Sequence, residues 1–323
     1  MAQPTNSFDS YTAIGNREDL QDKIYMVSPE KTPVMSAGRR FKAEAKFHEW
    51  QRDTLATPNK DNAVIEGDER SGTALTPTQR VGNYMQLLDK VAVVTTTQEK
   101  VNKAGRSSEM KYQIAEKAIP ELKRDIEAMM LSNNAAVAGA SGTARKSGGL
   151  GVFIYTNVSH GGAGATAAHT SGAPTVANTA GTNRAFTEAL LTPVLQSIYT
   201  NSGEQPSMVS VTPSLKTGFS AFVGIAANRH ETNGKQGVIT GGADIYVGNF
   251  GKLSIVPNYV QATANSDTAF ILNPEQYGLA YLQEFKTVPL AKTGHTDKEM
   301  VFAECGLVVT SEKSHGKVAN LIP

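Results

Sequence analysis

The chain has 323 residues and a single cysteine, Cys305, and this scarcity excludes several classes of protein. One thiol cannot form an intrachain disulfide, and there is no second thiol to share a metal ion with it. A disulfide-stapled secreted domain and a cysteine-rich zinc site are therefore both excluded. We expect Cys305 to be a small, buried apolar side chain in a protein that folds in the cytosol.

The chain also lacks a long hydrophobic run. No apolar stretch approaches the roughly 20 residues that a membrane-spanning helix needs. The N-terminus, Met1–Ser7, is polar and lacks the charged and then apolar order of a signal peptide. We therefore expect no targeting segment and no membrane partner.

An excess of charge of one sign is missing as well. Lys and Arg number 31 and Asp and Glu number 30, so the formal net charge is 31 − 30 = +1. Dedicated nucleic-acid binders usually carry a clear basic excess, so tight, sequence-specific DNA binding is not expected. Weak, non-specific contact with DNA through a local basic surface is the alternative. With 40% hydrophobic residues, the chain has enough apolar material for a core.

Motifs that carry enzymatic chemistry are absent from the sequence. The six histidines form no HxH or HxxxH pattern, and Cys305 has no metal-ligand spacing around it. The stretch Gly248–Leu253 partly resembles a phosphate loop but lacks the hydroxyl after its lysine, so a hairpin turn explains it better. We predict no catalytic residue, no metal site, no cofactor and no enzymatic activity. An enzyme with an unrecognised site is the alternative.

What the chain does contain is a set of projections without a core of their own. Near the N-terminus, Leu20, Ile24 and Val27 follow at helical spacing, and Pro29 and Pro33 then stop any helix. A helix this short cannot bury its own apolar stripe in water. We expect this arm to lie on another surface, either of the same chain or of a neighbouring copy.

A long hairpin is predicted next. Phe47–Arg52 indicates a strand, Leu55–Gly82 an exposed excursion rich in turn formers, and Val81–Thr97 a second strand. Isolated two-stranded hairpins are marginally stable in water. We therefore expect the hairpin to lean on a partner.

A long helix is predicted from Ser107–Ser108 to about Ala138, with Gly139 as its end. Pro120 lies inside it and should kink it near Glu116, and two shorter helices are the alternative. The apolar face is formed by Ala115, Ile119, Leu122, Ile126 and Met129.

The opposite face of this helix carries Lys117 with Glu121 and Lys123 with Glu127, each pair four residues apart. The following residues 139–182 are rich in Gly, Ala, Ser and Thr, which is the composition of a flexible loop. We expect neighbouring molecules to hold this loop.

The second half of the chain predicts an α+β lobe. Apolar spacing indicates a helix over 184–199, and a helix start is expected at Pro213. Strands are predicted at 208–212, 245–256 (paired about a Gly-Asn turn), 269–272, 278–282 and 300–310.

Short motifs occur in a fixed order along nearly the whole chain. They are Gly15–Leu20, Ser28–Pro33, His48–Trp50, Glu66–Asp68, Gly82–Tyr84, Lys103–Arg106, Glu121–Glu127, Gly142–Arg145, Gly149–Gly151, Ala291–Gly294 and His315–Gly316. With the order of the predicted parts, they resemble the major capsid (major head) proteins of tailed bacteriophages with the Hong Kong 97-type fold. The likeness is strongest to the podophage group typified by SU10.

The resemblance implies an α+β fold in five parts. These are an N-terminal arm (1–46), an extended-loop hairpin (47–97), a peripheral domain with a spine helix and the Gly-rich loop (98–183), an axial domain (184–283) and a return to the peripheral domain (284–323). It implies a structural protein that self-assembles as hexamers and pentamers into an icosahedral or prolate head around phage double-stranded DNA.

The implied partners are many copies of the chain itself, a portal protein, a decoration or scaffolding protein, and packaged DNA through non-specific contact. The implied location is the virion, after assembly in the host cytoplasm. An encapsulin-like shell around protein cargo is the alternative. We expect no cleaved scaffolding segment, because Met1 begins directly in the arm, and no cross-link of Lys60 to Asn59 or Asn62.

The residues expected to carry this function lie in the projections. Contacts between subunits are expected from Leu20, Ile24, Val27, Val64, Ile65, Glu66, Asp68 and Arg70. The basic stretch after the arm supplies the residues expected to face DNA, which are Arg39, Arg40 and Lys42.

Overall fold

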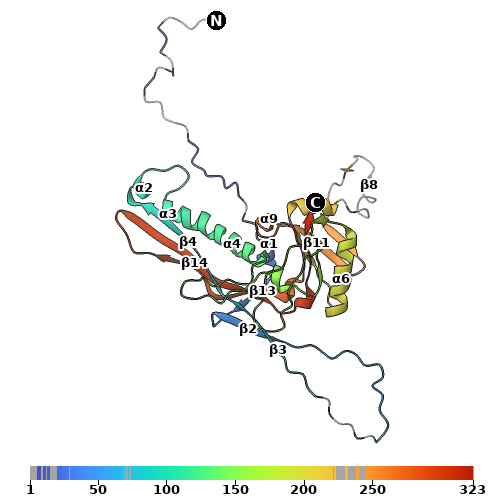
Figure 1. Ribbon diagram of the computed structural model, residues 1–323. Helices are drawn as coiled ribbons and strands as arrows, with labels where there is room; N and C mark the ends of the chain where they lie inside the picture. The colour runs from blue at the N-terminus through green and yellow to red at the C-terminus, as the bar shows by residue number, and fades with distance from the viewer. Residues whose placement is uncertain are drawn as a thin grey trace.

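The computed structural model shows a body built on two sheets, from which an N-terminal arm and a long loop project in different directions (Figure 1). The structure describes residues 6–8, 10–11, 13–14, 20–28, 30–67, 69, 72, 74–220, 222, 230–231, 238–239 and 244–322. No helix among these residues is long and apolar enough to cross a membrane.

The first sheet has four strands in the order β1-β13-β14-β4. Its strands are β1 (Arg39–Lys42), β13 (Tyr277–Pro289), β14 (Thr296–Val309) and β4 (Gln86–Thr95). β1 runs parallel to β13, and the other neighbours are antiparallel. β13 and β14 form one long hairpin, which extends well beyond the strands predicted at 278–282 and 300–310. Cys305 is fully buried in this sheet, as predicted.

One helical stretch, residues 109–131, covers this sheet and is called the spine helix below (Figure 1). It consists of α3 (Glu109–Lys111), the π-helix η1 (Tyr112–Ala118) and α4 (Ile119–Leu131), and the short α2 (Thr96–Lys100) precedes it. Ser108 caps its start by accepting the amide of Lys111, as predicted. Leu122 and Ile126 are fully buried against the sheet.

The end of the spine helix was predicted wrongly. The helix ends at Leu131, because Ser132 turns to an extended conformation and its hydroxyl bonds back to the carbonyl of Met129 at 2.8 Å. Gly151 then donates its amide to the carbonyl of Ser132 at 3.2 Å. A tertiary contact with the Gly-rich loop, and not Gly139, therefore stops the helix.

Pro120 does not split the helix in two, so that alternative is wrong. The turns directly before it are π-helical, and the amide of Ile119 bonds the carbonyl of Ile114 five residues earlier. A wider turn makes room for a proline ring that would clash with the carbonyl of Glu116 in a regular α-helix. The predicted disturbance near Glu116 is thus present as a π-helical segment.

The second sheet has six strands in the order β10-β11-β7-β12-β15-β5. They are β10 (Ile245–Gly248), β11 (Gly251–Pro257), β7 (Met208–Val211), β12 (Ala269–Leu272), β15 (Gly316–Val318) and β5 (Val158–Ser159). Helices α6 (Glu188–Ser202) and α7 (Pro213–Ser220) pack on it through side chains such as Leu191, Ile198 and Phe219. The hairpin about Gly248 and Gly251 confirms that this stretch is a turn.

The helix predicted over 184–199 begins later than expected, because Arg184 and Ala185 form β6, which pairs with β16 (Leu321–Ile322). β15 lies inside the second sheet, so residues 284–323 do not return wholly to the first. Shorter elements are α1 (Pro33–Ala37), α5 (Leu150–Phe153), the pair β8 (His230–Glu231) and β9 (Val238–Ile239), α9 (Gln261–Ala264), η2 (Pro274–Gln276) and η3 (Glu312–Ser314).

The predicted hairpin is present as β2 (Phe47–Arg52) and β3 (Gln79–Tyr84), which pair from Phe47↔Tyr84 to Arg52↔Gln79. The described residues between them have no helix or strand, and this loop stands out from the body (Figure 1). β4 pairs with β14 in the first sheet, so the second strand of this hairpin ends at Tyr84 and does not continue to residue 97 as predicted.

The short helix expected in the arm is wrong, since residues 20–28 contain no helix. So few residues cannot offset the cost of helix nucleation, and an extended path along the spine helix takes its place. Asp22 accepts the amide of Gly105 near the start of that helix, and Glu30 pairs with Lys123 in its middle. The arm and the spine helix therefore run in the same direction.

Candidate functional site

The arm is fastened to the body at Glu127, a fully buried carboxylate in the spine helix. Its two oxygens accept the amides of Val34 at 2.9 Å and Met35 at 2.6 Å, in the first turn of α1. Asn258, which follows β11, donates its side-chain amide to the same carboxylate at 2.6 Å. One side chain thus joins the arm, the spine helix and the second sheet.

This arrangement differs from the predicted pair of Lys123 and Glu127 on a solvated face. Lys123 pairs with Glu30 of the arm instead, and Glu127 points into the core. Burial raises the pKa of the Glu127 carboxyl, while the amides of Met35 and Val34 and the Asn258 side chain counteract part of that rise. Three charge-assisted hydrogen bonds make this carboxylate a clamp on the arm.

The predicted contact residues of the arm have different surroundings. Ile24 packs on its own chain, because a Cβ added to Gly105 would lie 2.8 Å from Cγ1 of Ile24. Leu20 is exposed, and Val27 is 92% exposed. A hollow of about 470 Å³ lies between the arm and residues 116–124 of the spine helix. The arm therefore covers its own chain incompletely and leaves apolar side chains uncovered.

The long loop between β2 and β3 holds the second predicted set. Val64, Ile65 and Glu66 all lie there and are exposed, Ile65 by 80%. Asp68 and Arg70 lie outside the described residues. Leu55 and Leu75 are two further exposed apolar side chains of the same loop. This projection, like the arm, therefore carries apolar groups that the chain's own core does not cover.

A buried amide anchors the base of the hairpin. The Asn83 side chain donates to Ser147 Oγ at 2.9 Å and to the carbonyls of Gly148 at 3.1 Å and Leu307 at 2.8 Å, and its oxygen accepts the amide of Gly148 at 2.9 Å. The Asn83 side chain is fully buried. It therefore ties the hairpin, the Gly-rich loop and β14 to one another.

The Gly-rich loop 139–182 is held by its own chain, which corrects the expectation that neighbours hold it. Asn133 donates to the carbonyl of Asn178 at 3.0 Å and accepts the Asn178 amide at 3.0 Å. Gly172 exchanges two backbone hydrogen bonds with β3. Glycine is required at Gly149, because a Cβ there would overlap the carbonyl of Ser132.

The structure does not gather the three basic residues proposed to face DNA. All are exposed on β1, but side chains alternate along a strand, so Arg40 and Lys42 share one face and Arg39 lies on the other. Lys42 also lies 3.5 Å from the carboxylate of Glu44. The basic stretch thus forms two small patches.

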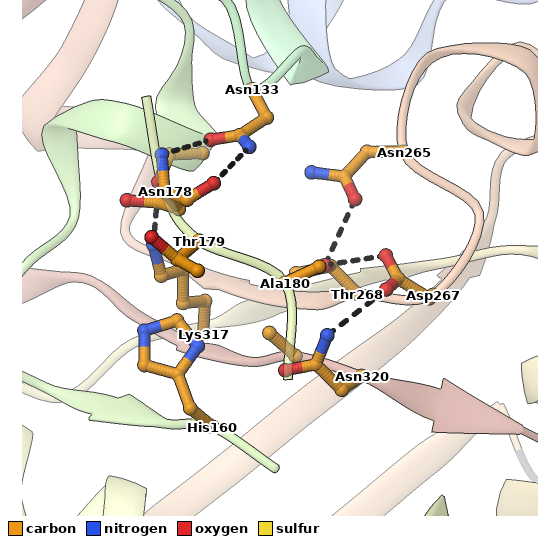
Figure 2. A pocket seen from close by; sticks show the side chains of 12 residues that line it. Asn133, His160, Asn178, Thr179, Ala180, Asn265, Asp267, Thr268, Lys317 and Asn320 are labelled. Carbon is orange, nitrogen blue, oxygen red and sulfur yellow. Dashed lines mark hydrogen bonds between the residues drawn. The ribbon is translucent and has the colours of Figure 1, made fainter. Parts of the chain in front are cut away.

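A small polar cavity lies between the Gly-rich loop and the second sheet (Figure 2). Its volume is about 60 Å³, which is room for a few water molecules. Lys317 enters it from β15 and donates to the carbonyl of Gly151 at 2.5 Å. Its other walls are mostly side-chain amides and hydroxyls, together with His160 and Asp267.

Burial lowers the pKa of Lys317 to about 7, and burial with the nearby charges of Lys317 and Arg184 lowers that of His160 to about 4. Asp267 accepts hydrogen bonds from the Thr268 hydroxyl at 3.2 Å and from the Asn320 side-chain amide at 3.4 Å. Both are drawn in Figure 2. Nδ1 of His160 and Oδ1 of Asn178 are buried and have no hydrogen-bond partner among the described residues. A polar cavity of this size therefore suits a few water molecules bound to such atoms more than a substrate.

No metal centre is formed by the described residues, which contain no group of three His, Cys, Asp or Glu side chains that could hold an ion. His315 is fully buried, and its Nδ1 accepts the amide of Asn273 at 3.2 Å. Burial lowers the pKa of His315 to about 4. This histidine is a neutral part of the core.

Sequence reasoning missed Asn83, Glu127 and Lys317 as positions that hold the segments together. Asn83 lies in the motif Gly82–Tyr84, but an amide in a strand carries no signal of burial by itself. Glu127 follows the apolar Ile126, and a helical projection that placed it beside the buried stripe was the available clue.

The comparisons with known proteins find one matching family and several solved structures with a similar fold. The family described as SU10 major capsid protein matches residues 3–322 of this chain. The major capsid protein of Escherichia phage Phieco32 is 34% identical over 135 residues, which are 42% of this chain and 38% of that protein. The matched stretch thus spans well under half the length of that curated relative.

Solved structures resemble the chain over most of its length. A structure from Gordonia phage Cozz has a TM-score of 0.60 at 11% identity and covers 95% of this chain and 92% of its own. The cyanophage Pam1 capsid has a TM-score of 0.59 at 11% identity, and the match covers 98% of this chain and 99% of that one. The SrpI encapsulin of Synechococcus elongatus PCC 7942 has a TM-score of 0.54 at 12% identity, and the match covers 95% of this chain and 92% of that one. These likenesses confirm the expected α+β fold of the Hong Kong 97 type.

Proposed function

Because the chain belongs to the family of SU10 major capsid proteins, we propose that many copies of it, as hexamers and pentamers, form the head that encloses phage double-stranded DNA. The match of the family over residues 3–322 is the observation that carries this proposal. The exposed apolar side chains of the arm and the long loop support it, because identical neighbours would bury them.

The parts of the chain suggest how a subunit works in such a shell. We assign the first sheet with the spine helix to the peripheral domain, and the second sheet with α6 and α7 to the axial domain at the centre of each capsomer. Leu20 and Val27 of the arm, with Val64, Ile65 and Glu66 of the long loop, would contact neighbours. Many such contacts accumulate affinity over a closed shell.

The proposal includes partners other than the chain itself. We assign Arg40 and Lys42 to weak, non-specific contact with packaged DNA, and Arg39 to the opposite face of β1. The near-zero net charge suits identical copies packed side by side. A portal protein and a decoration or scaffolding protein complete the proposed set, with assembly in the host cytoplasm and the virion as the final location.

Electron microscopy of the expressed protein tests the proposal. We expect closed shells from the intact chain. A variant in which a short Gly-Ser linker replaces Leu55–Thr76 keeps the β2–β3 stem, so we expect a folded, soluble subunit that forms no shells. A wild-type chain that stays a small oligomer at every concentration would contradict the proposal.

A compartment for protein cargo is the second candidate, because the SrpI encapsulin shares the fold over 95% of this chain. The content of native particles separates the two. A phage head contains double-stranded DNA, whereas a compartment of the second kind contains a packaged protein.

A further inference from the structure

The first sheet has an open edge at β4. Among the described residues, this last strand pairs only with β14, in an unbroken antiparallel register. Thr96 follows in the same register, and its amide bonds the carbonyl of His295 at 3.0 Å. The even-numbered residues therefore bond β14, and odd-numbered backbone groups point outward. These odd-numbered residues are Leu87, Asp89, Val91, Val93 and Thr95.

The open edge lacks the devices by which proteins usually protect an edge strand. β4 contains no proline and no bulge, and Asp89 is the only charged residue among the outward positions. Leu87, Val91 and Val93 are each about half exposed. An apolar edge with free amides and carbonyls is suited to pairing with another strand.

A groove runs beside this edge. It has a volume of about 530 Å³, with residues 91–95 of the edge on one side and Gln98, Glu109 and Gln113 on the other. Glu109 is engaged by Arg106 at 2.6 Å, so the described walls present no unpaired charge. An extended segment of about five residues, about 16 Å long, would fit along the strand.

We propose that this groove receives the segment Ala63–Glu66 from the long loop of a second copy, as a strand added to β4. The segment has two β-branched residues, lies between Pro58 and Gly67, and is exposed. Its residues form no backbone hydrogen bond within the described chain. The inference deepens the proposed function and rests on it.

The donor has to be another molecule. Figure 1 shows the long loop and the α2 end of β4 on opposite sides of the body, so the loop cannot reach the groove of its own chain. In an added strand, Ala63 and Ile65 would face one side of the sheet, and Val64 and Glu66 the other. Ala63, Val64 and Ile65 are neutral, and the single charged residue in the described groove walls, Glu109, is already paired with Arg106.

Engineered disulfides test the contact directly, because the native Cys305 is fully buried and burial raises the pKa of its thiol to about 12. Val93→Cys is combined in turn with Ala63→Cys, Val64→Cys and Ile65→Cys, and assembled particles are oxidised. We expect a ladder of covalent multimers on a non-reducing gel for at least one pair, since bridging needs Cα atoms about 4.4–6.8 Å apart.

Control pairs are Val93→Cys with Leu55→Cys, elsewhere in the loop, and Val93→Cys with Val27→Cys, in the arm. Shells that give no ladder with any of the three loop pairs overturn the inference. A ladder that forms equally well with Leu55→Cys also overturns the inference, because the contact would then not be specific to residues 63–65. A ladder that forms only with Val27→Cys overturns it too, because the arm would then occupy the groove.

A proline provides an independent test. Val93→Pro removes an amide that the folded chain does not use, whereas the control Val93→Thr keeps that amide and the strand preference. We expect both variants to melt close to wild type as subunits, and shell yield to fall at least tenfold for the proline variant only. Normal yield from Val93→Pro contradicts the inference and leaves the proposed function standing, whereas a wild-type chain without shells contradicts the proposed function itself.

Discussion

At the scale of single residues, buried polar side chains join segments that are distant in sequence. Asn83, Glu127 and Lys317 each bind backbone groups of other segments, and each is nearly or wholly inaccessible to water. A buried polar group that loses its partners costs more than a typical hydrogen bond is worth. These positions should therefore be sensitive to substitutions that leave their volume almost unchanged.

Asn83→Asp keeps the shape of the side chain but replaces the donor to three acceptors with a carboxylate oxygen. We expect it to lower the free energy of unfolding of the subunit by about 2–4 kcal/mol, because a buried charge then faces two carbonyl oxygens. Urea unfolding, followed by fluorescence of the single tryptophan, Trp50, on the neighbouring strand β2, measures this loss. A midpoint equal to wild type would show that the network is dispensable.

Glu127→Gln should release the arm. The amide has one oxygen where the carboxylate has two, so the amide of Val34 or Met35 loses its acceptor. We expect a loss of about 1–3 kcal/mol at neutral pH and faster proteolysis before α1. Asp125→Asn is the matched control on the same helix, since its half-exposed pair with Lys90 at 2.8 Å is worth less than about 1 kcal/mol. Equal proteolysis of both variants would contradict the clamp.

His315 predicts a loss of stability in mild acid. Its pKa is lowered by burial from 6.5 to about 4, so between these values the unfolded chain binds more protons than the folded chain. The contribution of this histidine is fully present above pH 6.5 and is lost as the pH falls to about 4, by about 3 kcal/mol. The raised pKa of Glu127 acts in the opposite direction, so it opposes part of this loss.

Unfolding free energies of the subunit at intervals from pH 7 to pH 4 test this dependence. His315→Gln, which cannot take up a proton, should show a smaller slope over that range. A variant with the slope of wild type would mean that other groups carry the acid sensitivity.

At the scale of elements, glycine decides how the Gly-rich loop packs against the end of the spine helix. Composition predicted flexibility, but several glycines of this loop lie where a Cβ would meet backbone atoms. Close backbone approach, rather than chain freedom, explains their presence. The contacts of this loop with Ser132 also explain why the helix ends before the predicted residue.

Gly149→Ala and Gly142→Ala separate these two roles within one loop. A Cβ at Gly149 would overlap the carbonyl of Ser132, whereas nothing lies within 4 Å of a Cβ at Gly142. We expect Gly149→Ala to cost about 2–4 kcal/mol and Gly142→Ala to be neutral or to stabilise by about 0.5 kcal/mol. Thermal unfolding of the two subunits compares them, and equal melting temperatures would contradict the packing argument.

At the scale of the whole molecule, projections and core obey different constraints. The two sheets bury their apolar residues within one chain, whereas the arm and the long loop expose theirs. A subunit can therefore fold alone and still be incomplete. Substitutions in the projections should change assembly without changing subunit stability.

Val27→Asp tests this separation. Because the side chain is 92% exposed, we expect the subunit to unfold within about 0.5 kcal/mol of wild type. Shell yield should fall several-fold, since an aspartate would have to be desolvated at a contact between subunits. Val27→Thr, of the same shape, is the control and should assemble better than the aspartate variant. Normal shells from Val27→Asp would place this residue outside the contacts.

The sequence by itself determined the order of the elements, the start of the spine helix and its apolar face from Ile119 onward, the hairpin stem and the strands of the second lobe, because these depend on local periodicity and turn residues. The predicted face was wrong at Ala115, which is exposed, because the π-helical turns bury Ile114 and Ala118 instead. Only the tertiary structure decided where the helix ends, that the arm is extended, that Glu127 is buried and that β4 and β15 belong to different sheets. These features depend on contacts between residues far apart in the chain, such as Glu127 with Val34 and Ser132 with Gly151. Local propensity is weak beside such contacts, so the pattern of a short segment cannot reveal them.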